Sequence, residues 1–262
     1  MLKRFIAVAL LFTSSLTYAE TVLESGSLSI LNDIQQRTKG LNEEQRVKVI
    51  TETLLGTPYN SHTLNASFSA KETLVINLKS MDCMTFIEYT EAFKRSENYD
   101  GFIHNLKNIR YTQDNISYVN RRHFFTDWLY QNDGMVFDIT QTISPNAVQV
   151  YKNLNLKSHG QRFIQGLPVT KRVVSYIPTE YIDEAVLDAL QTGDYIGIYA
   201  NRAGLDVSHV GIAIRQGGKI YFRNASSLKL NLQVMDIELM RYLRGKAGII
   251  VVRSTVDSST GY

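Results

Sequence analysis

The 262-residue sequence has one cysteine, four prolines and no run of basic residues. A single cysteine excludes a disulfide within the chain, and so few prolines exclude a proline-rich disordered protein. The formal net charge is only +3, and the absence of a basic stripe argues against nucleic acid as a partner. With 44% apolar residues, the sequence predicts an ordered globular chain.

The N-terminus has the pattern of a secretory signal peptide. Lys3 and Arg4 precede the largely apolar stretch 5–16, and the small residues Thr17 and Ala19 follow. The stretch is shorter than the about 20 apolar residues that a membrane-spanning helix needs. We therefore expect cleavage after Ala19, a mature chain without an integral membrane segment, and a periplasmic or secreted location.

An exported protein normally pairs its cysteines, but Cys83 has no partner in the chain. Such a thiol is either a buried small apolar group or a functional one. Asp82 is a plausible N-cap of a helix that begins at Cys83. Backbone N–H groups at a helix start favour a thiolate and can hold an oxyanion, so we expect a lowered thiol pKa, opposed by Asp82.

The rest of the pattern predicts an α+β fold. Helices are expected over 27–55, with Asn42 as a cap, from Cys83 onward, and over 99–109. Short strands rich in β-branched and aromatic residues are expected at 195–200, 208–215, 219–224 and 248–253. We interpret 20–262 as a single domain with a helix-rich insertion at about 95–190.

His209 is the best of five histidines as a partner for the thiol. It begins the strand S-H-V-G-I-A-I, where alternation places it on one face with Gly211 and Ala213. These small residues would let the Cys83 helix approach that face. His62 and His159 lie in polar loops, His104 in a predicted helix, and His123 before an aromatic cluster.

The following hairpin supplies a third polar group. A turn at Gln216-Gly217 places His209 opposite Asn224, whereas a turn at Gly217-Gly218 places it opposite Ser226. In both registers Asn224 and Ser226 share the face of His209, and an amide oxygen there can orient the imidazole. A three-residue loop would put Asn224 on the other face.

Several motifs together resemble the NlpC-type branch of the papain-like cysteine hydrolases, which act on bacterial peptidoglycan. In chain order they are G-T-P-Y (56–59), D-C-M-T-F-I-E (82–88), T-G-D-Y-I-G-I-Y (192–199), S-H-V-G-I-A-I (208–214) and F-R-N-A-S-S (222–227). The D-C-x-T-F-x-E helix, N-R-R-H-F-F-T-D-W-L (120–129) and D-I-T (138–140) resemble the N-acetylmuramoyl-L-alanine amidase-like subfamily. The resemblance covers about residues 50–253.

This resemblance implies a papain-like core, with a cysteine-bearing helix packed on an antiparallel sheet. It implies Cys83 as nucleophile, His209 as base and Asn224 in the third position, where relatives often have histidine. The residues expected to contact substrate are Tyr59 near the oxyanion, Asp82 near the scissile bond, Ser208, and a wall formed by Arg121, His123 and Trp128.

The implied activity is hydrolysis of the amide between N-acetylmuramic acid and L-alanine, in peptidoglycan or its fragments, through a thioester. The alternatives are a cysteine endopeptidase that cuts the D-glutamyl–diamino acid bond, and a non-catalytic peptidoglycan-binding protein with an inert thiol. No cofactor or metal is expected, because the five histidines show no H-E-x-x-H spacing.

Overall fold

The computed structural model describes residues 21–113, 115–130 and 134–254, so the predicted signal peptide lies outside the described residues. Four longer helices occupy the N-terminal half, and short ones follow. The α-helices are α1 (Ser27–Thr38), α2 (Glu43–Thr53), α3 (Cys83–Lys94), α4 (Tyr99–Arg110), α5 (Asp127–Tyr130), α6 (Thr140–Ile143), α7 (Glu184–Ala189) and α8 (Leu239–Tyr242). The 3-10 helices are η1 (Tyr118–Asn120) and η2 (Thr179–Tyr181). Within the described ranges, none of these helices has the length and apolar character needed to cross a membrane.

The strands form one large antiparallel sheet and one small parallel pair. They are β1 (Thr21–Leu23), β2 (Leu74–Ile76), β3 (Val136–Asp138), β4 (Val148–Leu154), β5 (Thr170–Pro178), β6 (Tyr195–Tyr199), β7 (Val207–Gln216), β8 (Lys219–Ala225), β9 (Val234–Glu238) and β10 (Gly248–Ser254). The large sheet has the order β4-β5-β10-β6-β7-β8-β9, with β3 also paired to β10, while β1 pairs with β2. The predicted mixed α+β class is confirmed.

Local sequence explains where the N-terminal helices begin. Asn42 caps α2 in a reciprocal pair of hydrogen bonds with Gln45, and Asp82 caps α3 in the same way with Thr85. Both arrangements satisfy backbone N–H groups that the first turn leaves unpaired. Since α3 begins at Cys83, the thiol lies in the first turn of a buried helix.

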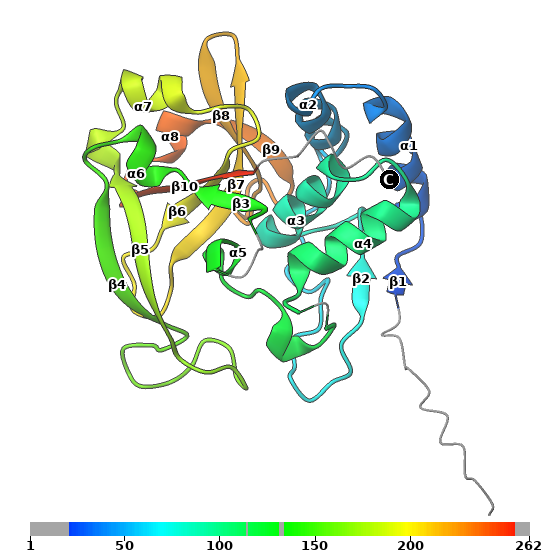
Figure 1. The fold of residues 1–262 in the computed structure, drawn as a ribbon, viewed down its shortest axis with the longest axis horizontal. Coiled ribbons are helices and arrows are strands. Elements are labelled where there is room, and N and C mark those ends of the chain that lie inside the picture. The colour runs from blue at the N-terminus through cyan, green and yellow to red at the C-terminus, as the bar shows by residue number, and fades with distance from the viewer. Residues whose placement is uncertain (1–20, 114, 131–133, 255–262) are drawn as a thin grey trace, which may run out of the picture.

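The sheet has a separate apolar core on each face. One core joins Phe86 and Ile87 of α3 to Val210 and Ile212 of β7. The other contains Ala213 of β7. It is completed by side chains of β6, β8, β10 and the short helices α7 and α8, namely Ile196, Ile198, Ile220, Phe222, Ile249, Val251, Val186, Leu239 and Leu243. In Figure 1, α1–α4 lie on one side of the large sheet, and α6, α7 and α8 lie on the other.

The expected helix-rich insertion at about 95–190 is only partly right. It contains α4 and several short helices, but it also contributes β3, β4 and β5 to the large sheet. Strands β4 and β5 pair over seven residues, from Val148↔Tyr176 to Leu154↔Thr170. The sequence analysis missed β5. The segment therefore extends the sheet rather than standing apart from it.

Candidate active site

The turn G-T-P-Y reaches the start of α3 through backbone pairing. Pro58 forms an antiparallel bridge with Gln233, and Tyr59 forms a parallel bridge with Met81. The Met81 N–H donates to the Pro58 carbonyl at 3.1 Å, and the Asn60 N–H donates to the Met81 carbonyl at 3.0 Å. This short ladder brings Tyr59 beside Asp82 and Cys83, although more than twenty residues of chain separate them.

The Cys83 thiol is half-buried and its pKa is high. Burial and the neighbouring Asp82 carboxylate raise the pKa of the thiol to about 12, although the backbone N–H groups of Val210, Cys83 and Met84 act to lower it. The expectation of a lowered thiol pKa is therefore wrong for this structure. The helix start does direct N–H groups at the sulfur, but loss of solvation outweighs them.

Helix α3 packs on the antiparallel sheet as expected, but the predicted face of β7 is wrong. Helix α3 packs on the face of β7 that carries Val210 and Ile212, not on the face of Gly211. A Cβ atom at Gly211 would lie 2.6 Å from the Arg223 carbonyl oxygen and 2.6 Å from the Phe222 ring. The glycine thus gives space to the neighbouring strand β8. The sulfur meets β7 at the end of the helix, where the Val210 N–H points at it.

His209 and Asn224 form a buried hydrogen-bonded pair. His209 Nε2 and Asn224 Oδ1 are 2.9 Å apart, and Asn224 Nδ2 donates to the Phe222 carbonyl at 3.2 Å. Since the amide nitrogen already donates to a carbonyl, the amide oxygen faces the imidazole and accepts from Nε2–H. A neutral His209 then has an unprotonated Nδ1, which can accept a proton.

The hairpin turn decides between the two registers left open by the sequence. Strands β7 and β8 pair from Gln216↔Lys219 to Ile212↔Arg223, so the turn is Gly217-Gly218, and both glycines have positive φ. Although this register brings Ser226 level with His209, the imidazole bonds to Asn224. Ser226 instead accepts hydrogen bonds from its own loop, from the Leu228 N–H and the Asn231 amide.

Tyr242, which the sequence analysis did not select, belongs to the same cluster. Its ring is inclined by 29° to the His209 ring, with centroids 6.2 Å apart, and its centroid lies 4.7 Å from that of the Phe222 ring. Burial and Cys83 raise the pKa of Tyr242 to about 12, which places it beside the thiol as well. The sequence around α8 carries no signal for this role, because only the fold returns α8 to β7 and β8.

Tyr59 and Asp82 lie beside the thiol, whereas the Ser208 hydroxyl donates to the Ile198 carbonyl at 3.4 Å. Burial, Cys83 and Asp82 raise the pKa of Tyr59 to about 12. Asp82 Oδ1 accepts from the N–H and the hydroxyl of Thr85, both at 2.8 Å. Ser208 is exposed at a bulge where Ile198↔His209 is followed by Tyr199↔Val207. A bulge of this kind re-aims its neighbours, here next to His209.

The three residues predicted to form a substrate wall have other partners. Arg121 pairs with Glu72 at 2.8 Å and with the Asn65 carbonyl at 2.7 Å. His123 Nε2 lies 2.7 Å from the Tyr118 carbonyl, and burial together with Arg121 lowers the pKa of His123 to about 4. Near neutral pH, His123 is thus an uncharged donor and cannot attract a carboxylate.

Trp128 lies in the core with 3% of its surface exposed. Its ring makes an edge contact with Tyr195, with centroids 5.2 Å apart, and it lines a small internal cavity with Glu91 and Met135. The aromatic cluster therefore packs the interior, and this ring is not available to a sugar.

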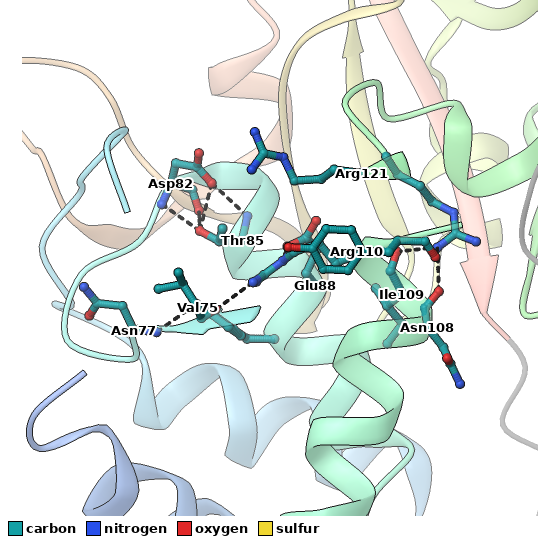
Figure 2. A network of polar contacts seen from close by, with 12 residues as sticks. Val75, Asn77, Asp82, Thr85, Glu88, Asn108, Ile109, Arg110 and Arg121 are labelled. Carbon is teal, nitrogen blue, oxygen red and sulfur yellow. Dashed lines mark hydrogen bonds and ion pairs between the residues drawn. The ribbon is translucent and has the colours of Figure 1, made fainter. Parts of the chain in front are cut away.

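A buried ion pair holds the middle of α3. Arg110 of α4 donates from Nε to Glu88 at 2.7 Å and from a terminal nitrogen to the Val75 carbonyl at 2.6 Å. Figure 2 shows Glu88 facing Arg110, further along α3 from the Asp82–Thr85 cap. Burial alone would lower the pKa of Arg110, but the Glu88 carboxylate raises it overall, so the guanidinium stays charged. The pair fixes α3, and with it Cys83, against α4 and β2.

These features define a mixed α+β protein whose large antiparallel sheet carries a hydrogen-bonded histidine and asparagine, with a cysteine at the start of helix α3 beside strand β7. A model of the AmiA-like family, described as N-acetylmuramoyl-L-alanine amidase-like, matches residues 49–249. The chain therefore belongs to this family. No curated protein matches the chain.

Solved structures show the same fold. A Legionella pneumophila protein with 23% identity aligns with a TM-score of 0.73, covering 87% of this chain and 94% of its own. An N-acetylmuramoyl-L-alanine amidase from Bacteroides uniformis has 27% identity and a TM-score of 0.70, covering 82% of this chain and 99% of its own. A second structure named as an amidase of that organism has 28% identity and a TM-score of 0.68, covering 79% and 97%.

Proposed function

We propose that the protein is a cysteine amidase of the NlpC-type, papain-like superfamily. It hydrolyses the amide between the lactyl group of N-acetylmuramic acid and L-alanine in peptidoglycan or its fragments. The family match supports the choice of bond. The predicted signal peptide supports a location in the periplasm or outside the cell. The observation that carries the mechanism is the 2.9 Å hydrogen bond from His209 to Asn224, close to a thiol at which three backbone N–H groups point.

The reaction proceeds in two steps, acylation of Cys83 and hydrolysis of the resulting thioester. Nδ1 of His209 takes the thiol proton as the Cys83 sulfur attacks the carbonyl carbon, and the N–H groups of Cys83 and Met84 hold the oxyanion. His209 returns the proton to the departing L-alanyl nitrogen, which leaves a thioester. Water, deprotonated by His209, then cleaves the thioester and releases the muramyl acid and the free thiol.

The electrostatics of the site favour a resting state in which both Cys83 and His209 are uncharged. Because the pKa of the thiol is raised to about 12 and burial lowers the pKa of His209, the favoured resting state is thiol and neutral imidazole. Proton transfer then accompanies the attack rather than preceding it. Tyr59 lies beside Cys83 and donates to the oxyanion. Its raised pKa keeps the hydroxyl protonated for this role.

Digestion of purified muropeptides by the wild type and by Cys83→Ala tests the proposal, with products identified by mass. Release of the intact stem peptide from the sugar by the wild type alone supports the amidase. Release of L-alanyl-D-glutamate would show an endopeptidase instead. If a folded wild type cuts neither bond, the proposal fails.

One observation favours a second candidate, a non-catalytic peptidoglycan-binding protein. A half-buried thiol with a pKa of about 12 is the state expected for an inert cysteine. The hydrogen-bonded His209–Asn224 pair argues the other way, because a binding protein has no need for an oriented imidazole. Muropeptide binding without cleavage would establish this candidate.

Replacing Asn224 by alanine should lower kcat by about 10- to 100-fold with little change in KM, because His209 loses the acceptor that fixes its tautomer. Ser226→Ala is the matched control. Ser226 lies on the same strand end but makes no hydrogen bond to His209. Steady-state kinetics on a soluble muropeptide measures both variants. Equal effects of the two changes would remove Asn224 from the mechanism.

The acid limb of the pH–rate profile should lie below the ordinary histidine pKa. Burial lowers the pKa of His209, assisted by Lys246, while the Asn224 hydrogen bond and Asp82 oppose the shift. A lowered pKa keeps the competent neutral imidazole as the pH falls through about 6.5, the ordinary pKa of histidine. We expect kcat/KM to hold down to that pH and to fall only in more acidic buffer. An acid limb above pH 7 would contradict a buried neutral base.

A further inference from the structure

Two residues expected to contact substrate, Arg121 and His123, cannot offer a free positive charge to it. Arg121 is paired with Glu72, and His123 is neutral near pH 7. Another cation, Lys246, lies close to the candidate active site. Lys246, in the turn between α8 and β10, is exposed, and within the described ranges its ammonium group has no hydrogen bond or acidic partner.

Geometry links Lys246 to the candidate active site. Its Nζ lies 5.5 Å from the centroid of the Tyr242 ring, and the centroids of the Tyr242 and His209 rings are 6.2 Å apart. The turn is anchored, because the Thr179 hydroxyl donates to the Lys246 carbonyl at 2.7 Å and the Lys246 N–H donates to the Leu243 carbonyl at 2.9 Å. The ammonium is thus held beside the ring that packs on His209.

Two groups of opposite charge lie near His209. Asp82 and Lys246 are both close enough to act on the imidazole, with opposite sign. Arg241 and Arg244, which flank Tyr242 in the chain, are also exposed and have no acidic partner among residues 21–113, 115–130 and 134–254. An anionic group of a bound molecule would meet favourable charge on the Lys246 side and repulsion on the Asp82 side.

We propose that Lys246 binds a carboxylate of the substrate and so makes the site selective for acidic stem peptides. This inference rests on the proposed amidase function. In an L-alanyl-D-glutamyl stem, the carboxylate nearest the scissile bond is the α-carboxylate of the glutamyl residue. An ammonium–carboxylate contact would hold that group and orient the peptide along the α8 side of the site.

Two muropeptides that differ only at this group test the proposal: N-acetylmuramyl-L-alanyl-D-glutamate and its α-amide. The wild type should favour the acid in kcat/KM by about tenfold, mostly through KM, as expected for one charged contact at a partly exposed site. Lys246→Gln should bring this ratio close to one, mainly by raising KM for the acid. Lys246→Arg should restore the preference. Lys39→Gln, which removes an exposed lysine at the end of α1, should behave as the wild type.

Binding to the Cys83→Ala protein separates this inference from the proposed function. Its dissociation constants for the two muropeptides should differ in the same sense, and adding Lys246→Gln should abolish the difference. If the wild type cleaves both substrates equally, or Lys246→Gln keeps the preference, the inference fails while the amidase stands. If the wild type cleaves neither, the proposed function fails, and the binding ratio alone decides whether Lys246 reads a carboxylate.

Discussion

Replacing Cys83 by serine is expected to lower kcat for muropeptide cleavage by at least about a thousandfold, because a hydroxyl is a far weaker nucleophile than sulfur at this position. The loss should appear in kcat rather than KM, since the side chain bonds to substrate only during the reaction. Mass spectrometry of the released stem peptide measures the rate. The change should barely alter stability, because serine is nearly isosteric and the site is half-buried.

Thermal unfolding by circular dichroism is the control that separates lost chemistry from lost fold. A Cys83→Ser protein that keeps more than a tenth of the wild-type rate would remove Cys83 as nucleophile. Alkylation of the wild type by iodoacetamide tests the charge state independently. With the pKa of the thiol raised to about 12, the rate should climb steadily from pH 6 to 9 without a plateau. A plateau near pH 6 would instead show a preformed thiolate–imidazolium pair.

Replacing Arg110 by methionine is expected to lower the free energy of unfolding by about 3–5 kcal/mol, because it leaves the buried Glu88 carboxylate without its cation. Urea denaturation monitored by circular dichroism measures the change. The same substitution should lower amidase activity, because α3 carries Glu88 in its middle and Cys83 at its start.

Two controls show whether the cost comes from the uncompensated charge. The double variant Glu88→Leu, Arg110→Met removes both charges and should recover most of the lost stability. Arg37→Met removes an arginine from an exposed pair with Asp33, and should cost less than about 1 kcal/mol. If Arg110→Met costs no more than Arg37→Met, the buried pair does not hold α3 as argued.

The raised pKa of the Cys83 thiol and the lowered pKa of His209 have the same physical cause. Each group is kept in its neutral form by burial, and the groups that would favour charge are insufficient to reverse it. In the mechanism that we propose, such a site avoids a permanently reactive thiolate. In that proposal, substrate binding supplies the carbonyl toward which the sulfur moves as His209 accepts the proton.

The local parts of this site were predictable from sequence. The α3 cap depends on Asp82 and Thr85, three residues apart, and the hairpin depends on adjacent Gly217 and Gly218, which tolerate positive φ. Alternation along β7 and β8 restricted the partner of His209 to Asn224 or Ser226. Each of these signals arises from a few neighbouring residues, and so survives without knowledge of the fold.

Other features were settled only by tertiary packing. Which face of β7 meets α3 depends on where Phe86, Phe222 and the two cores lie, and alternation treats both faces alike. Strand β5 was missed because it depends on tertiary context, in which it pairs with β4 over seven residues and with distant β10 at two positions. The burial of Trp128 and the neutral state of His123 likewise depend on neighbours that sequence spacing does not specify.

Short-range signals in the sequence predicted the helix that begins at Cys83, the strand that carries His209 and the hairpin that returns Asn224. The charge state of the thiol and the approach of Tyr242 and Lys246 depend on tertiary packing. The physical reason is range: caps, turns and alternation act over a few residues, whereas desolvation and charge at a site depend on every segment that the fold packs around it.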